Sequence, residues 1–288
     1  MATTDLIRYD PPPQQIVRAD SDEDLIAVWL RGKRNPKTRA LYLYTIKGFR
    51  EVVPGPLASL TLNDLEDYRE SLAHLRPATQ AQRIATIKSL LSFGHKTGYL
   101  KVNVGAAIQP PKGKNTLAER ILSQEEVLRM LVASKANPRN ELFLRLIYRS
   151  GGRVSEIVTA TWADLIARED SAQITLFGKR DKTRVVALSL DLYHALQMLR
   201  DGAADTDRIF PITRQRAWKI IKAIAKRAGI SGKVSPHWFR HSHATHALDN
   251  GADLNLVSQT LGHSDLAITG MYLHVRPGSS SGDYLKVG

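Results

Sequence analysis

The stretch of residues 172–188, AQITLFGKRDKTRVVAL, departs from the helical patterns that dominate the rest of the chain. Two short segments rich in apolar and β-branched residues, 173–177 and 184–188, flank the polar residues 178–183. This arrangement is typical of a β-hairpin. Residues 162–165 are a candidate third strand. The sequence therefore predicts a fold that is mainly α-helical with a small antiparallel β-sheet.

Helical periodicity continues on both sides of the hairpin. On the C-terminal side, helices are expected at residues 192–199, 214–228, 236–250 and 254–261. Ser264 is expected to cap a last helix around Tyr272. On the N-terminal side, Ser123 and Glu126 have the spacing of a capping box that opens another helix.

A separate, all-helical domain is expected before residue 106. Its helices should begin near Ser21, Pro36, Thr61 and Pro77. After it, two adjacent prolines followed by Lys-Gly-Lys-Asn interrupt helix and predict a linker. The chain thus divides into a flexible N-terminal arm, a helical domain, a linker, a domain that contains the hairpin and a C-terminal tail, at residues 1–20, 21–105, 106–119, 120–276 and 277–288.

The composition narrows the classes of function. The chain has 288 residues and a formal net charge of +13, which favours a polyanionic partner such as nucleic acid. It has no cysteine, so disulfides, thiolate metal sites and cysteine nucleophiles are excluded. No apolar run is long enough to span a bilayer, and no signal-peptide pattern opens the chain. We therefore expect a soluble cytoplasmic protein without a membrane partner.

Basic residues cluster in the N-terminal helices and around the turn of the hairpin. Contacts to nucleic-acid phosphates and solvated helix faces are the two interpretations of such clusters. The expected phosphate contacts are Lys37, Arg39, Arg76, Arg83, Lys88, Arg180, Lys182 and Arg184.

Side chains suited to phosphodiester chemistry gather near the C-terminus. His237 and Arg240 have the spacing H-x-x-R, and His263 and Tyr272 follow them. A guanidinium matches phosphate oxygens, an imidazole transfers protons near neutral pH, and a phenol can act as a covalent nucleophile. Together these residue types indicate chemistry on a phosphodiester.

Further candidates lie upstream. Arg153 follows two glycines that permit a tight turn at a helix start, and Glu156 is close enough to orient its guanidinium. Lys179 lies at the expected tip of the hairpin, from which a mobile ammonium can deliver a proton. Lys182 competes with Lys179 for this role.

Four histidines between residues 237 and 246 raise the alternative of a metal site. The stretch has no H-E-x-x-H pattern and no acidic residue to complete a ligand set, so we expect no metal and no cofactor. His237 and Arg240 are instead expected to face a substrate. His241 or His246 is expected to form a hydrogen bond inside the fold.

In order along the chain, these motifs resemble those of the tyrosine recombinase, or phage integrase, family. Residues 151–156, Gly-Gly-Arg-Val-Ser-Glu, are similar to the family's first arginine box, and Gly178-Lys179 to its hairpin lysine. Residues 237–246 are similar to its second box. Leu-Gly-His-Ser at 261–264 and Met-Tyr-Leu-His-Val at 271–275 complete the pattern.

The resemblance covers about residues 21–275. Departures at Gly152, Phe239 and 268–270 leave every reactive group in place. The resemblance implies a helical core-binding domain of SAM-like fold, followed by a tyrosine-recombinase catalytic domain. It implies an enzyme that recombines double-stranded DNA at a specific site, cytoplasmic and associated with the nucleoid when bound to DNA.

The resemblance further implies a tetramer on DNA, either of identical chains or with a related recombinase, that works through a Holliday junction. The first twenty residues are too few to form an arm-binding domain, which favours an Xer-like or transposon-type system over a phage integrase with arm sites.

Roles for the site residues also follow from the resemblance. Tyr272 would attack the scissile phosphorus, form a 3'-phosphotyrosyl link and release a 5'-hydroxyl, which conserves the bond energy without ATP or metal. Arg153, Arg240 and His263 would stabilise the added negative charge. His237 would accept the phenolic proton.

Lys179 would protonate the leaving oxygen, again by resemblance, with Glu156 as a supporting residue. Two other classes of function remain as alternatives: a DNA-binding module without activity, and a metal-dependent nuclease. A type IB topoisomerase shares the phosphotyrosyl chemistry but has a different domain layout.

Overall fold

The computed structural model describes residues 19–111, 117–178, 183–230, 234–263 and 265–273. The chain forms two compact units, Met1–Lys114 and Asn115–Gly288, and the division falls within the range predicted as a linker. Lys179, Arg180, Lys182, Ser264, the predicted tail and most of the predicted arm lie outside the described residues. Ala19, which the sequence assigns to the arm, is instead buried in the core of unit 1.

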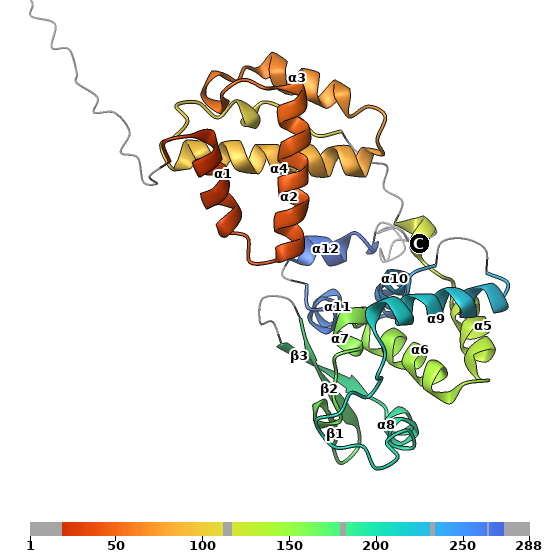
Figure 1. Ribbon diagram of the computed structural model, residues 1–288. Coiled ribbons are helices and arrows are strands. Elements are labelled where there is room, and N and C mark those ends of the chain that lie inside the picture. Colours follow the sequence, from red (N-terminus) through yellow and green to blue (C-terminus); the bar gives the residue numbers. More distant parts are fainter. Residues whose placement is uncertain (1–18, 112–116, 179–182, 231–233, 264, 274–288) are drawn as a thin grey trace, which may run out of the picture. The chain divides into compact units, whose positions relative to one another are not determined.

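Unit 1 is helical, as the sequence predicts (Figure 1). Side chains at the expected caps start two of its helices: the Ser21 hydroxyl accepts from the Asp24 amide, and Thr61 and Asp64 form a reciprocal capping box. The elements are α1 (Asp22–Arg31), α2 (Pro36–Val52), η1 (Leu57–Ser59), α3 (Leu62–Ser71), α4 (Pro77–Lys96) and η2 (Val104–Ala106).

The core of unit 1 draws on all four of its α-helices. Phe49 and Tyr68 pack edge to face, with ring centroids 4.9 Å apart. The carboxylate of Asp22, at the start of α1, accepts hydrogen bonds from Arg50, the Leu57 amide and the Tyr99 hydroxyl. These bonds satisfy a carboxylate that burial would otherwise penalise.

Unit 2 is a group of helices with a three-stranded sheet at one side (Figure 1). Its helices are η3 (Ala118–Arg120), α5 (Gln124–Ser134), α6 (Pro138–Ser150), α7 (Val154–Ile157), η4 (Trp162–Asp164), α8 (Leu190–Gln197), α9 (Arg214–Arg227), α10 (Pro236–Asp249), α11 (Leu254–Leu261) and α12 (Leu266–Gly270). Helix α6 contacts α5, α10, α8 and the sheet, so it forms the centre of the unit. The sequence interpretation does not include α6.

The predicted hairpin is present as strands β2 (Ala172–Phe177) and β3 (Thr183–Leu188), paired antiparallel with Leu176 opposite Arg184. The third strand lies later than expected. Thr161 and Asp164 form a capping box that turns residues 162–164 into a 3-10 helix, and β1 (Leu165–Ala167) follows it. The mainly helical class with a small antiparallel sheet is confirmed.

The last helix also differs from its prediction. Helix α12 begins after Asp265, whose side chain accepts from the Ala267 amide, and it ends at Gly270. Tyr272 therefore lies beyond the helix instead of within it. No helix in the described ranges has the length and apolar character needed to cross a bilayer.

Gly151 is the point where α6 ends close to two other segments. Its φ of +57° is left-handed, and an added Cβ would lie 2.7 Å from Leu261 Cδ2 and 2.8 Å from His243 Cδ2. Only glycine combines this backbone conformation with so close an approach. The turn at Gly151 thereby brings the start of α7 toward α10 and α11.

Gly151→Ala is therefore expected to destabilise unit 2 more than Gly251→Ala. Both positions have positive φ, so alanine at either costs roughly 1–2 kcal/mol of backbone strain. At Gly151 overpacking adds roughly 1–3 kcal/mol, whereas an added Cβ at Gly251 meets nothing within 4 Å. Equilibrium unfolding in urea measures both losses, and equal losses would contradict the close packing at Gly151.

Candidate active site

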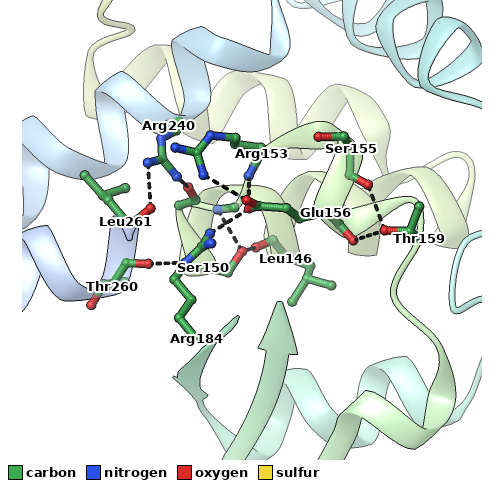
Figure 2. A network of polar contacts seen from close by, with 12 residues as sticks. Leu146, Ser150, Arg153, Ser155, Glu156, Thr159, Arg184, Arg240, Thr260 and Leu261 are labelled. Atoms are coloured by element: carbon green, nitrogen blue, oxygen red, sulfur yellow. Dashed lines mark hydrogen bonds and ion pairs between the residues drawn. The ribbon is translucent and has the colours of Figure 1, made fainter. Parts of the chain in front are cut away.

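Glu156 is the buried carboxylate around which the site is organised (Figure 2). It lies at the third position of α7, and Arg153 is the N-cap of the same helix. Glu156 Oε1 accepts from Arg153 Nη1 at 2.9 Å, and Oε2 accepts from the Arg153 backbone amide at 2.8 Å. Glu156 therefore orients Arg153, as the sequence suggested.

Arg184 reaches the same carboxylate from β3. Its Nη2 donates to Glu156 Oε2 at 2.7 Å, and its Nε donates to the Thr260 carbonyl at 2.7 Å (Figure 2). Burial raises the pKa of Glu156, but the hydrogen bonds from Arg184 and Arg153 outweigh burial and hold that pKa below its ordinary value. Glu156 is therefore ionised at neutral pH.

Arg240 lies on α10 and is almost fully buried. Its Nη1 donates to the Gly151 carbonyl at 2.7 Å and its Nη2 to the Leu261 carbonyl at 2.6 Å (Figure 2). Burial, and then the charges of Arg153 and Arg184, lower the pKa of Arg240 to about 10. The guanidinium is fixed and still charged at neutral pH, with N–H groups left over for a ligand.

Positive charge exceeds negative charge in this network. Arg153 and Arg184 are both paired with the carboxylate of Glu156, whereas Arg240 is bonded only to backbone carbonyls (Figure 2). After burial, the charges of Arg153 and Arg184 are the next largest causes of the lowered pKa of Arg240, so the guanidiniums repel one another. An anion that accepts from Arg153 and Arg240 would relieve it, so the arrangement favours a phosphate group.

His263 follows α11 and is tied to α12. Its Nδ1 lies 2.7 Å from the hydroxyl of Thr269, which is fully buried. Burial, and then the charges of Arg240 and Arg153, lower the pKa of His263 to about 4. The imidazole is therefore neutral at physiological pH and acts as a hydrogen-bonding group.

Tyr272 is buried, with 3% of its surface exposed. Its Oη lies 2.8 Å from Nδ1 of His241. Burial raises the pKa of Tyr272, while the charge of Arg240 opposes the rise. Because Arg240 and His241 are neighbours on α10, the same turn of helix holds a fixed guanidinium and the phenol of Tyr272.

His237 is exposed on the first turn of α10, and no hydrogen bond occupies its ring among the residues that the structure describes. Partial desolvation, and then the charges of Arg240 and Arg153, lower its pKa. A neutral imidazole that faces solvent beside two guanidiniums is suited to accept a proton.

The other histidines of α10 have structural partners. His243 Nδ1 lies 2.8 Å from the Tyr148 carbonyl, and His246 Nδ1 lies 2.8 Å from the Tyr148 hydroxyl. Both His241 and His246 thus form hydrogen bonds inside the fold, which resolves the alternative that the sequence left open. Among the described residues, no three His, Asp or Glu side chains are arranged to hold a metal ion.

The predicted DNA contacts have different environments. Lys37, Arg39 and Arg76 are exposed, and Arg83 packs over the Tyr44 ring. Lys88 instead donates to the carbonyls of Ala106 and Ile108. Lys88 thus has a role within the fold.

Arg184 likewise has protein partners, which hold its guanidinium within the site. The sequence interpretation placed it in a basic cluster and missed Glu156 as its partner. The alternation of β3 was the available signal: Arg184 shares the strand face of Val186 and Leu188, which are buried. Thr269 was missed as well, because one threonine near a helix end carries no such signal.

A model of the phage integrase family matches residues 120–278 of the chain. The chain belongs to the phage integrase family. Tyrosine recombinase XerD of Oceanobacillus iheyensis is 37% identical over 215 residues, 69% of this chain and 71% of the relative. XerD of Bifidobacterium longum is 33% identical over 254 residues, which cover 79% of this chain and 82% of the relative. The chain is accordingly a tyrosine recombinase, and the enzyme class expected from the motifs is confirmed.

Solved structures of tyrosine recombinases share the fold. A XerH site-specific recombinase in a post-cleavage complex with palindromic difH substrate has a TM-score of 0.72 at 22% identity, over 89% of this chain and 82% of that one. A lambda integrase tetramer bound to a Holliday junction has a TM-score of 0.67 at 17% identity, over 85% of this chain and 76% of that one.

Acidification is expected to weaken unit 2 of this recombinase. Burial lowers the pKa of His241, His243 and His263 to about 4, whereas the ordinary value is 6.5. Below pH 6.5 the unfolded chain takes up protons that the folded chain does not. The free energy of unfolding should therefore have its full value above pH 6.5 and should decrease as the pH falls toward 4.

Urea unfolding from about pH 7 to about pH 5 measures the slope of the free energy of unfolding against pH. His243→Gln should make this slope less steep, because it removes one imidazole whose pKa is lowered in the folded state. His194→Gln, on the exposed side of α8, is the matched control and should leave the slope unchanged. A slope as steep in His243→Gln as in the parent chain would contradict the assignment.

Proposed function

We propose that this recombinase cleaves and rejoins double-stranded DNA at a specific site through a 3'-phosphotyrosyl intermediate. Tyr272 Oη attacks the scissile phosphorus, the bond from phosphorus to the 5'-oxygen breaks, and a 5'-hydroxyl leaves. The reverse attack by a 5'-hydroxyl of a partner strand restores a phosphodiester. The bond energy is conserved in the tyrosyl ester, so ATP is not needed.

One observation carries this proposal: consecutive residues of α10 provide the buried guanidinium of Arg240 and the histidine that contacts the phenol of Tyr272. A fixed cation next to a phenol serves a reaction in which the phenol attacks an anion. The excess positive charge around Glu156 supports an anionic substrate.

Arg153, Arg240 and His263 would bind the two non-bridging oxygens as charge develops on them. Donors that are already fixed by Glu156, Gly151 and Thr269 need little reorganisation when the reaction occurs. Removal of one such donor costs about a hundred- to thousandfold in rate in comparable sites. Arg240→Ala and Arg153→Ala are each expected to lower the cleavage rate by a factor in this range.

Proton transfers complete the reaction. His237 is proposed to accept the phenolic proton, because its ring is neutral, exposed and free of a protein hydrogen bond among the described residues. Tyr272 has to leave His241 to reach a phosphate, since its phenol is buried in this conformation. Lys179 is proposed to protonate the departing 5'-oxygen, with Glu156 in its supporting role.

The assembly on DNA is proposed from the related structures. A Holliday-junction pathway needs four cleaving subunits, and the lambda integrase tetramer is the precedent of the same fold. Exposed Lys37, Arg39 and Arg76 would contact phosphates. The proposed contacts also include Arg83, and Arg180 and Lys182, which lie between β2 and β3 in the sequence. A cytoplasmic location, with association to the nucleoid on DNA, follows from such a substrate.

Covalent trapping tests the nucleophile. On a nicked suicide substrate, the parent protein should accumulate a protein–DNA adduct, because the released strand diffuses away and religation fails. Tyr272→Phe should form no adduct. Tyr148→Phe is the matched control, since Tyr148 is also a tyrosine in contact with a histidine of α10, and it should retain cleavage.

Each other outcome identifies a different function. An adduct with Tyr272→Phe would show that the nucleophile is another residue. DNA binding without cleavage by the parent protein would favour a binding module, and cleavage to free ends without an adduct would favour a metal-dependent nuclease.

Metal independence is a separate prediction. Because the guanidiniums supply the positive charge that a divalent ion would otherwise provide, adduct formation should proceed at an unchanged rate in excess EDTA. The same assay with added Mg²⁺ is the control. Loss of cleavage in EDTA and its recovery with Mg²⁺ would contradict the mechanism.

A further inference from the structure

Arg184 lies on the buried face of the hairpin, where a charged side chain is unusual. In β3, Val186 and Leu188 are buried while Thr183, Val185 and Ala187 are exposed, and Arg184 shares the face of the buried pair. Only 10% of the Arg184 side chain is exposed. An arginine in this place needs partners that repay its desolvation.

Its partners belong to two different segments of the site. Nη2 bonds Glu156 on α7, and Nε bonds the carbonyl of Thr260 on α11, each at 2.7 Å. The planar guanidinium holds both bonds at a fixed angle, which a lysine ammonium cannot do. Arg184 therefore sets the position of α7 relative to the end of α11.

The aliphatic part of Arg184 constrains the same turn. Gly262 caps α11 with a φ of +67°, and an added Cβ there would lie 3.1 Å from Arg184 Cδ. His263 is the next residue after Gly262. The turn before His263 thus contacts Arg184 in two ways. The Thr260 carbonyl accepts from the guanidinium, and Gly262 packs against the aliphatic part of the side chain.

Arg184 also determines how Glu156 holds Arg153. Glu156 Oε2 accepts from both Arg184 and the Arg153 amide, while Oε1 accepts from the Arg153 guanidinium. With Arg184 in place, the carboxylate cannot rotate without losing a bond. Loss of Arg184 would remove one of the three bonds that fix the carboxylate and would thereby loosen its hold on the guanidinium of Arg153.

We propose that Arg184 is a positioning residue of the cleavage reaction, which acts through Glu156 on Arg153 and through the Thr260–Gly262 turn on His263. This inference rests on the proposed function. Both groups that Arg184 positions act on the non-bridging oxygens of the phosphate. Arg184 itself contacts neither DNA nor the reacting atoms.

Arg184→Lys is the test variant, because it keeps the charge beside Glu156 but cannot hold both bonds. Single-turnover cleavage at saturating protein should fall about a hundredfold, the cost of a small misplacement at a reacting centre. DNA affinity and its salt dependence should stay unchanged. Arg145→Lys, which alters an ion pair with the exposed Asp191, is the matched control and should cleave as the parent does.

A substrate with a methylphosphonate at the scissile position separates the possible routes. Its neutral phosphorus centre needs less charge stabilisation, so the defect of Arg184→Lys should largely disappear on it. A 5'-bridging phosphorothiolate has a leaving group that needs no protonation, and the defect should persist there. Rescue by the phosphorothiolate alone would overturn the proposal in favour of a role in leaving-group protonation.

A double-mutant cycle tests whether Arg184 acts through Glu156. If Arg184 acts through Glu156, Arg184→Lys should reduce cleavage much less in a Glu156→Gln background than in the parent. Additive losses would overturn the link to Glu156. Weaker DNA binding with a normal cleavage rate at saturation would replace the proposal with a direct DNA contact. Absence of cleavage by the parent protein would instead defeat the proposed function itself.

Discussion

The buried carboxylate of Glu156 is the constraint on which the rest of the site depends. It is the shared acceptor for Arg153 and Arg184, which come from α7 and β3. Breaking a buried ion pair by removal of one partner costs roughly 3–5 kcal/mol, because the other charge remains desolvated. The helical core and the hairpin are thus held together at the proposed active site, and distortion of either would move Arg153 or Arg184.

The site has more positive than negative charge, and the proposed nucleophile is buried. Arg240 is fixed by two backbone carbonyls and not by a carboxylate, so its charge remains available to a phosphate. Tyr272, meanwhile, is buried against His241. The cationic part of the site is preassembled, whereas the phenol must change its position to react. Binding of DNA to the guanidiniums can therefore precede commitment to cleavage.

Local signals in the sequence predicted most of the elements, because capping boxes such as Thr61 with Asp64 and the alternation of the hairpin act over a few residues. The expected catalytic set came from the order of the motifs and stays a prediction. What failed were features decided by distant partners. Arg184 looked like part of a basic cluster, since its bond to Glu156 spans 28 positions. Tyr272 was expected in the last helix, but helix α12 ends at Gly270.

A structure of the protein on nicked DNA with vanadate in place of the scissile phosphate tests the central claim most directly, because vanadate adopts the geometry of the transition state. The account predicts Tyr272 Oη at one apex, released from His241, with Arg153 and Arg240 donating to equatorial oxygens and Glu156 still joined to Arg153 and Arg184. A vanadate held by other side chains, or with a different residue at the apex, would contradict it.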